Sequence, residues 1–260
     1  MSNYPPVSCM CLTYGRTHVL EEAIESFLRQ NYQGEKELII LNDFDQQNLI
    51  FKHPQVKIIN IPQRFHTVGE KRSACAALCS HDILLVWDDD DIYLPHRIDF
   101  TIKKMLSNKK YYYFFKPIKA FVMNNNKIIN TSYNIFHSGS GWRRELYDAV
   151  RGYAHMGSGQ DLEIELAFEK YDISKKQNYT DIKDEEIYYI YRWAGTETFH
   201  LSGFEKDKEG QKPGNKKVQE YIERKIQNSN IKIGDIELFP KWNLDYSQIV
   251  IDYIKDKKNE

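Results

Sequence analysis

Short apolar runs separated by helical segments constrain the fold of this chain more than any other feature of its sequence. Four runs have the length of buried strands, and they cover residues 7–12, 37–41, 56–61 and 83–87. Apolar residues recur at helical spacing in the segments 17–28, 69–80 and 95–106. Buried strands joined by helical crossovers predict an α/β fold, with a mixed, mostly parallel sheet flanked by helices on both faces.

Polar residues follow three of these runs at the point where each strand is expected to end. They are Thr13, Asp43 and the four aspartates Asp88, Asp89, Asp90 and Asp91. Ligands of parallel sheets bind outside the carboxyl ends of the strands. The sequence therefore predicts that these residues lie together in one functional site.

The second half of the chain has a different pattern. Strands are expected at 111–115, 118–123, 127–131 and 186–193, a hairpin turn at 124–126, and helices at 142–150 and 160–170. The charged segment 205–217 predicts a mobile loop. Two closing helices are expected at 216–228 and 246–257, on either side of an extended piece at 231–239.

Composition excludes several classes of protein. The chain has 36 Lys and Arg against 37 Asp and Glu, which argues against a protein that coats nucleic acid. No apolar stretch approaches the roughly 18 residues of a transmembrane helix. No signal peptide is visible, so we expect a cytoplasmic protein, and peripheral attachment to a membrane stays open.

The chain has four cysteines, Cys9, Cys11, Cys75 and Cys79. We expect them to be reduced thiols in the core rather than ligands of a zinc ion, because Cys-x-Cys is not a usual spacing in zinc fingers.

The four aspartates at 88–91, called the aspartate run below, are the strongest chemical signal in the sequence. Adjacent carboxylates repel one another by about 1 to 4 kcal/mol per pair, depending on the effective dielectric constant. Because these carboxylates directly follow an apolar strand, solvent or a bound cation must offset their mutual repulsion. Carboxylate oxygens shared with phosphate oxygens favour Mg²⁺ or Mn²⁺. The alternative is a solvated loop in which Asp91 helps to cap the next helix.

Several ordered motifs resemble those of family 2 glycosyltransferases, which have the GT-A fold. Asp88-x-Asp90-Asp91 and the residues up to Arg97 are similar to the family's Asp-x-Asp segment. Residues 7–16 and 21–30 resemble its first strand and helix, residues 69–73 its Gly-x-x-Arg-Asn turn, and residues 157–161 its Glu-Asp motif. Asn42, Ser73 and Gln160 depart from the family pattern. The resemblance covers about residues 6–204.

The resemblance implies an inverting, metal-dependent transfer of a sugar from a nucleotide sugar, with UDP favoured, to a hydroxyl of a glycan or glycoconjugate. It implies a GT-A domain over residues 1–204, with the nucleotide-sugar side at about 1–110 and the acceptor side at about 111–204. Residues 205–260 would then pack on the same domain as a mobile loop and a helical C-terminal extension. Two alternatives stay open: a nucleotidyltransferase that acts on sugar phosphates, and a non-catalytic module that binds nucleotide sugars or carbohydrate.

The resemblance also implies roles for single residues. The nucleotide is expected to contact Thr13, Tyr14, Arg16, Asp43, Lys71, Arg72, Asp88 and Asp89, with Asp88 on the ribose side. Asp90 and His200 are the expected ligands of Mn²⁺ or Mg²⁺. Asp161 is the expected catalytic base, with Glu163 and Glu165 as weaker candidates. The sugar or acceptor is expected to contact Asp91, Gly141, Trp142 and Gln160. For Lys71 an exposed helix face, and for Trp142 a place in the core, are the alternatives.

Overall fold

The computed structural model describes residues 4–107, 109–133, 137–171, 179–192, 220, 223–228 and 230–259. The predicted mobile loop at 205–217 and the predicted metal ligand His200 lie outside these residues. Of the predicted helix at 216–228, only part is described.

A seven-stranded sheet lies at the centre of the fold, in the order β11-β7-β10-β5-β1-β2-β4. Its strands are β1 (Val7–Thr13), β2 (Lys36–Asn42), β4 (Val56–Asn60), β5 (Ile83–Val86), β7 (Phe114–Pro117), β10 (Gly141–Arg143) and β11 (Tyr179–Thr180). The neighbours β5, β1, β2 and β4 run parallel, whereas β10 is antiparallel to β5 and β7. The predicted mixed, mostly parallel sheet is therefore confirmed.

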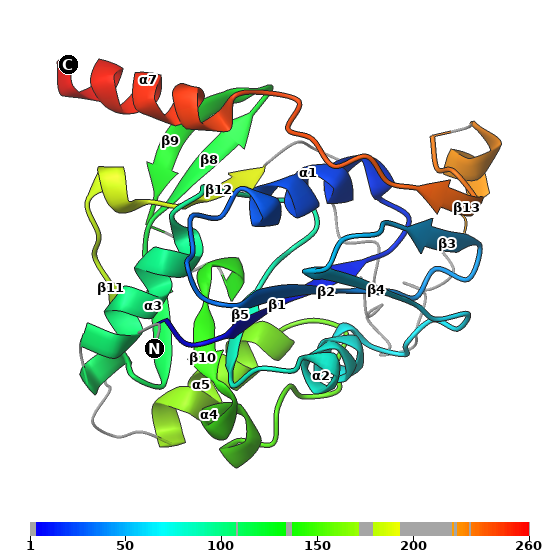
Figure 1. Cartoon of the computed structure of the whole chain (residues 1–260), viewed down its shortest axis with the longest axis horizontal. Coiled ribbons are helices and arrows are strands. Elements are labelled where there is room, and N and C mark those ends of the chain that lie inside the picture. The colour runs from blue at the N-terminus through cyan, green and yellow to red at the C-terminus, as the bar shows by residue number, and fades with distance from the viewer. Residues whose placement is uncertain are drawn as a thin grey trace, which may run out of the picture.

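Helices cover both faces of this sheet, with α1 and α2 on opposite sides (Figure 1). The helices are α1 (Thr17–Leu28), α2 (Val68–Leu78), α3 (Arg97–Ser107), α4 (Arg144–Ala149), α5 (Gln160–Tyr171) and α7 (Tyr246–Asn259). Successive strand residues alternate between two cores: Cys9 and Cys11 pack with α1, whereas Met10 packs with α2, α4 and α5. All four cysteines are buried and unpaired with one another, which confirms the prediction of core thiols.

Two smaller sheets complete the fold. One has the order β6-β12-β8-β9 and consists of β6 (Ile92–Tyr93), β8 (Ala120–Asn124), β9 (Lys127–Ser132) and β12 (Tyr189–Arg192). The other pairs β3 (Gln47–Ile50) with β13 (Gly234–Glu237). Asn125 and Asn126 have φ angles of 46° and 63° between β8 and β9, as a tight hairpin needs, so the predicted turn is confirmed. Short 3₁₀ turns are η1 (Lys109–Tyr111), η2 (His137–Gly139) and η4 (Asp184–Glu186).

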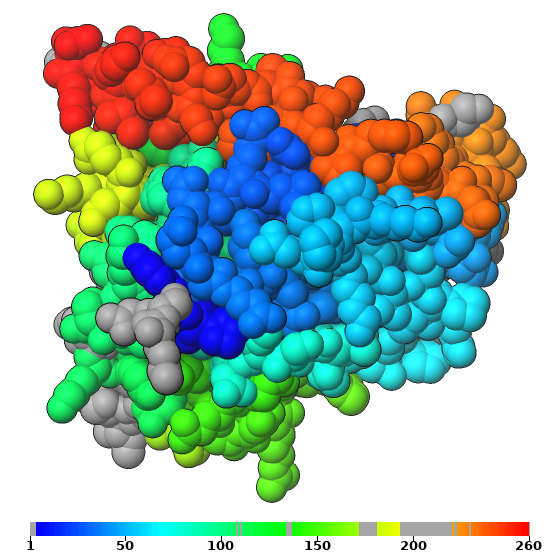
Figure 2. Space-filling model, in the orientation of Figure 1, coloured from blue at the N-terminus to red at the C-terminus, as the bar shows by residue number. Residues whose placement is uncertain are grey.

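The C-terminal residues form a band across one face of the molecule (Figure 2). Glu22 of α1 fixes this band, because its carboxylate accepts hydrogen bonds from the backbone N–H of Asn243, at 2.9 Å, and from the hydroxyl of Tyr246, at 2.6 Å. The indole N–H of Trp242 donates to Ser26 at 2.9 Å. None of the described helices combines the length and the apolar character that crossing a bilayer requires.

Gly141 was expected to let the sugar or acceptor come close, and the structure corrects this. A Cβ atom at Gly141 would lie 2.5 Å from Cδ2 of Leu85 and 3.2 Å from Cγ2 of Thr101. The missing side chain therefore makes room for the core, where β10 inserts between β5 and β7. The same strand replaces the start of the helix predicted at 142–150, which begins at Arg144 instead.

We predict that Gly141→Ala lowers the free energy of unfolding by about 1–3 kcal/mol, because an extra methyl group overpacks this site. Gly139→Ala is the matched control, since its Cβ would lie at an ordinary 3.5 Å from Pro117. Chemical denaturation of both variants measures the difference. Equal stability of the two variants would contradict the proposed role of Gly141 in packing.

Candidate functional site

The carboxyl ends of three neighbouring strands bring the predicted polar residues together. Thr13 ends β1 and lies in register with Asn42, which ends β2 and precedes Asp43. The aspartate run begins two residues after Val86, the last residue of β5. Parallel strands carry their carboxyl ends to one edge of a sheet, so the three segments meet there.

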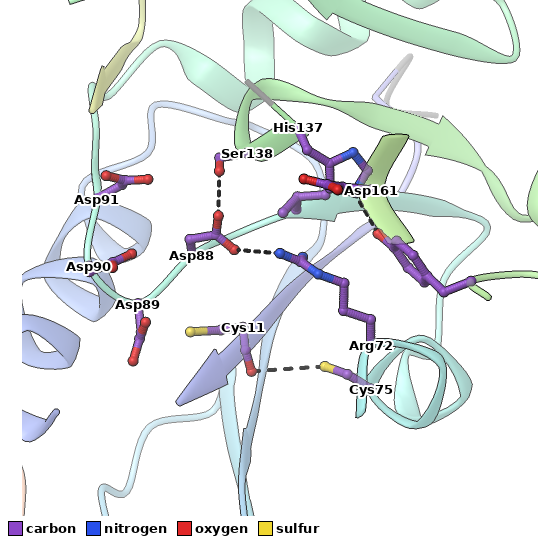
Figure 3. A network of polar contacts seen from close by, with 12 residues as sticks. Cys11, Arg72, Cys75, Asp88, Asp89, Asp90, Asp91, His137, Ser138 and Asp161 are labelled. Atoms are coloured by element: carbon purple, nitrogen blue, oxygen red, sulfur yellow. Dashed lines mark hydrogen bonds and ion pairs between the residues drawn. The ribbon is translucent and has the colours of Figure 1, made fainter. Parts of the chain in front are cut away.

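All four side chains of the aspartate run are buried, so the alternative of a solvated loop is wrong. Asp88 accepts a hydrogen bond from the hydroxyl of Ser138 and forms an ion pair with Arg72, whose Nη2 lies 3.4 Å away (Figure 3). The backbone N–H of Asp88 donates to the hydroxyl of Tyr93 at 2.9 Å. Ser138 and Arg72 thus hold the carboxylate of Asp88, and Tyr93 holds its backbone.

Arg16 supplies the counter-charge for the middle of the run. Its guanidinium donates to Oδ2 of Asp90 at 2.7 Å and also pairs with Asp89. Burial opposes the positive charge on Arg16, but Asp89 and Asp90 outweigh it and raise the pKa of the guanidinium. In this structure Arg16, predicted to contact the nucleotide, therefore binds the aspartate run instead.

Asp91 holds the run against β12. Its carboxylate accepts hydrogen bonds from the hydroxyl of Tyr189, at 2.6 Å, and from the backbone N–H of Arg192, at 3.1 Å. Burial, followed by the charges of Asp90 and Asp88, raises its pKa well above the usual value. Asp91 is 3% exposed, and its contacts in this structure hold the fold together; its contact with a sugar or acceptor stays a prediction.

Lys71 forms a second buried ion pair at the same edge of the sheet. Its ammonium pairs with Asp43 and donates to the carbonyl oxygen of Thr13 at 2.7 Å. The side chain is 3% exposed, so the alternative of an exposed helix face is wrong. Burial lowers the pKa of Lys71, and Asp43 opposes this shift. Asp43 also accepts from the backbone N–H of Phe65 at 3.0 Å, which ties the loop before α2 to β2.

Tyr14 lies next to this pair in a small apolar cluster with Phe44 and Ile231. Its ring centroid is 5.0 Å from that of Phe44, and the guanidinium of Arg64 lies 4.7 Å from the Tyr14 ring. Tyr14 is therefore close to the predicted nucleotide residues, but its ring packs against the protein.

Asp161 and Gln160 begin α5, directly after Gly159, whose φ of 78° favours glycine. Asp161 is partly exposed, and its side chain accepts a hydrogen bond from the backbone N–H of Leu162 at 2.9 Å. Burial disfavours the charged form of Arg72. The negative charges of Asp88 and, more weakly, Asp161 favour it and help to raise the pKa of the guanidinium. Arg72 thus couples the predicted base electrostatically to the aspartate run.

Two predicted residues belong to the core instead. Trp142 is fully buried and packs against Phe168 and Tyr147, with ring centroids 5.5 and 6.5 Å away, so it is no platform for a sugar. Glu165, a weaker candidate for the base, is buried and pairs with Lys116 at 2.6 Å and with His137 at 2.7 Å. Glu163, the other weaker candidate, is exposed.

Sequence reasoning missed Ser138, His137, Lys116 and Tyr153, which surround these residues. His137 and Ser138 lie in a Gly-rich stretch at 137–144, but Lys116 and Tyr153 lie outside it. The hydroxyl of Ser138 and the imidazole of His137 find their partners through tertiary contacts, which spacing alone does not specify.

The aspartate run has the oxygen donors that a hard divalent cation requires. Mg²⁺ is commonly held by one or two carboxylates together with substrate phosphates. No three His, Cys, Asp or Glu side chains converge as a metal site in the part of the chain that the structure describes. Asp90 fits the role of a cation ligand, because its Oδ2 already binds a cationic group, the guanidinium of Arg16.

The sequence model of glycosyl transferase family 2 matches residues 8–160, more than half of the 260 residues. The chain belongs to glycosyl transferase family 2. This confirms the predicted family and the assignment of the chain to the transferases. No curated protein sequence matches this glycosyltransferase.

Solved structures of TarS from S. aureus share its fold. The complex of TarS residues 1–349 with UDP-GlcNAc gives a TM-score of 0.54 at 13% identity, over 96% of this chain and 71% of that chain. The complex of the same residues with UDP gives 0.53 at 12% identity, over 98% and 72%. A longer TarS structure gives 0.52 at 11% identity over 97% of this chain, which spans only 43% of its length. The likeness supports the predicted GT-A fold.

We predict that Asp43→Asn lowers the free energy of unfolding by about 3–5 kcal/mol, because it leaves the buried charge of Lys71 without its partner. The loss should shrink as the pH is raised toward 9. The folded-state pKa of Lys71 is already lowered and falls further without Asp43, so the neutral amine forms more easily in alkali. Denaturation at several pH values measures both effects. The double variant Asp43→Asn/Lys71→Met should recover most of the stability, and a double variant as unstable as the single one would contradict the pairing.

Proposed function

We propose that this glycosyltransferase moves a sugar from a UDP-sugar to a hydroxyl group of a glycan or glycoconjugate, with inversion at the anomeric carbon. One juxtaposition carries the proposal: the aspartate run and Arg72 lie at the carboxyl ends of the strands, where Arg72 pairs with Asp88, and Asp161 lies in the same region at the start of α5 (Figure 3). TarS, which shares the fold, was solved with UDP and with UDP-GlcNAc, and this supports a UDP-sugar as the donor class.

Thr13, Asp43, Lys71 and Arg72 are proposed to surround the nucleotide. The hydroxyl oxygen of Thr13 is buried and has no hydrogen-bond partner among the described residues, so a ligand group would satisfy it. Lys71 and Arg72 lie near the N-terminus of α2, where the helix dipole favours anions. Their ion pairs hold both cations in place before a diphosphate binds.

Asp90 is proposed to bind Mn²⁺ or Mg²⁺, with Asp88 on the ribose side of the nucleotide. A bound cation would neutralise the negative charge that develops on the departing diphosphate. The guanidinium of Arg16 holds Oδ2 of Asp90 in the ligand-free chain, so Arg16 and a cation compete for this carboxylate. His200 stays a prediction as a further ligand.

Asp161 is proposed as the general base. It takes the proton of the acceptor hydroxyl while the hydroxyl oxygen bonds to the anomeric carbon. The bond from that carbon to the diphosphate oxygen breaks in the same step, and attack from the opposite side inverts the anomeric configuration. Partial exposure supports this role, because the carboxylate of Asp161 is reachable by an acceptor.

We predict that Asp161→Asn lowers kcat for sugar transfer by about 10²- to 10⁴-fold, because the amide cannot accept the proton. UDP affinity should change less than twofold. Asp148→Asn, on the exposed surface of α4, is the matched control and should transfer at the wild-type rate. Initial rates and isothermal titration with UDP measure both quantities. A variant that keeps more than a tenth of wild-type transfer would exclude Asp161 as the base.

We predict that Arg16→Gln tightens Mn²⁺ binding to the donor-free protein by about tenfold, which corresponds to removing a competing interaction of about 1.4 kcal/mol. Paramagnetic resonance titration of free Mn²⁺ measures this without any turnover. Arg29→Gln is the control. Arg29 directly follows α1 and pairs with Glu25 of that helix at 2.6 Å, but it lies outside the site. Weaker Mn²⁺ binding in Arg16→Gln would contradict this competition. It would mean that Arg16 holds the carboxylates in the arrangement that the cation requires.

A further inference from the structure

A buried charged cluster anchors the helix that carries Asp161. We call Lys116, His137 and Glu165 the Glu165 cluster. Nζ of Lys116 donates to both carboxylate oxygens of Glu165 at 2.6 Å, and Nδ1 of His137 lies 2.7 Å from Oε1 of Glu165. All three residues are at least nine-tenths buried. Three elements that are distant in the sequence, β7, η2 and α5, therefore meet at one carboxylate.

The cluster sets the rotation of α5 about its own axis. Glu165 follows Asp161 by four residues, so the two side chains lie on the same face of the helix, one turn apart. Ile164 and Phe168 also anchor α5, but through apolar packing, which fixes direction less strictly than hydrogen bonds do. Gln160, the first residue of α5, is buried as well, so the start of the helix also packs against the fold.

The hydrogen bonds of the cluster allow one arrangement of protons. Several groups act on the pKa of His137, and burial, the strongest influence, lowers it. The imidazole is therefore neutral at physiological pH. The carboxylate of Glu165 can only accept, so Nδ1 of His137 carries the proton and donates it. Nε2 then accepts from the hydroxyl of Tyr153, 2.8 Å away. Burial acts to raise the pKa of Glu165, but the hydrogen bond from His137 and the charge of Lys116 lower it overall, so the carboxylate stays ionised.

The same cluster reaches the aspartate run through η2. Ser138, the residue after His137, donates its hydroxyl to Asp88 and accepts a hydrogen bond from Arg97 at its carbonyl oxygen, at 2.8 Å. The 3₁₀ turn η2 thus binds Glu165 of α5 through His137 and Asp88 through Ser138, and Figure 3 shows the contact with Asp88. This arrangement fixes the spacing between Asp161 and the proposed nucleotide site.

We propose that the Glu165 cluster is a positioning device that holds Asp161 at its working distance from the donor, and that Glu165 is its central positioning residue. The inference rests on the proposed function, since it presupposes that Asp161 is the base. Glu165 is not itself the base, because its carboxylate is buried and accepts hydrogen bonds from Lys116 and His137. Stability alone does not require the cluster, since apolar residues often replace buried ion pairs without loss of stability.

The test compares Glu165→Gln with Glu169→Gln, the same substitution one helical turn further along α5, where the side chain is partly exposed. Glu165→Gln should lower kcat by about 10- to 100-fold, because small displacements of a catalytic group cost this much. The KM for the donor and the affinity for UDP should change less than twofold. The downfield proton resonance of Nδ1 of His137 should shift or disappear.

A second variant separates positioning from folding. Lys116→Met/Glu165→Met removes both charges, so it should fold with near-normal thermal stability and still lose kcat. Normal kcat in either folded variant would overturn the positioning role.

Failure of the positioning role is distinguishable from failure of the proposed function. Loss of transfer in Asp161→Asn together with normal kcat in Glu165→Gln would overturn the positioning role alone. Retained transfer in Asp161→Asn would overturn the assignment of the base, and the positioning role with it.

Discussion

The burial of four consecutive carboxylates at the end of β5 is the constraint on which the rest of the structure depends. A buried charge without a partner costs several kcal/mol, so the fold must bring cations and hydrogen-bond donors to this one turn. It does so from separate elements: Arg16 before α1, Arg72 on α2, Ser138 in η2 and Tyr189 on β12. The α/β topology is what makes this convergence feasible, because each crossover returns the chain to the same edge of the sheet.

The general location of the site could be predicted from the sequence, whereas the pairing within it could not. An apolar run followed by carboxylates locates a strand end, and parallel strands place their ends together, so the neighbourhood of Thr13, Asp43 and Asp88 followed from pattern alone. Which donor meets which carboxylate depends on the approach of elements far apart in the chain. Arg16 and Asp90, for example, are 74 residues apart, and no local spacing reports their contact.

The errors in the fold prediction have a common physical origin. The pattern at 142–150 favours a helix, but Gly141–Arg143 form β10 because they pair with β5 and β7. Gln47–Ile50 have no strong strand pattern of their own and become β3 by pairing with β13. The ring of Trp142 could stack on a sugar, but the register of β10 points this side chain toward the core, where it is fully buried. Tertiary pairing overrode local preference in each case.

The pairing of β3 with β13 also has a consequence for synthesis of the protein. Asn48 and Asp235, which are hydrogen-bonded across this pair, lie 187 residues apart. At about 5–20 residues per second, β3 leaves the ribosome about 10–40 s before β13 is made. During that interval the backbone groups of Gln47–Ile50 lack the strand that pairs with them in the folded chain. The interval is longer still for Glu22 and its partner Tyr246, which are 224 residues apart. Synthesis of the C-terminal residues is therefore the step that completes two contacts begun near the N-terminus.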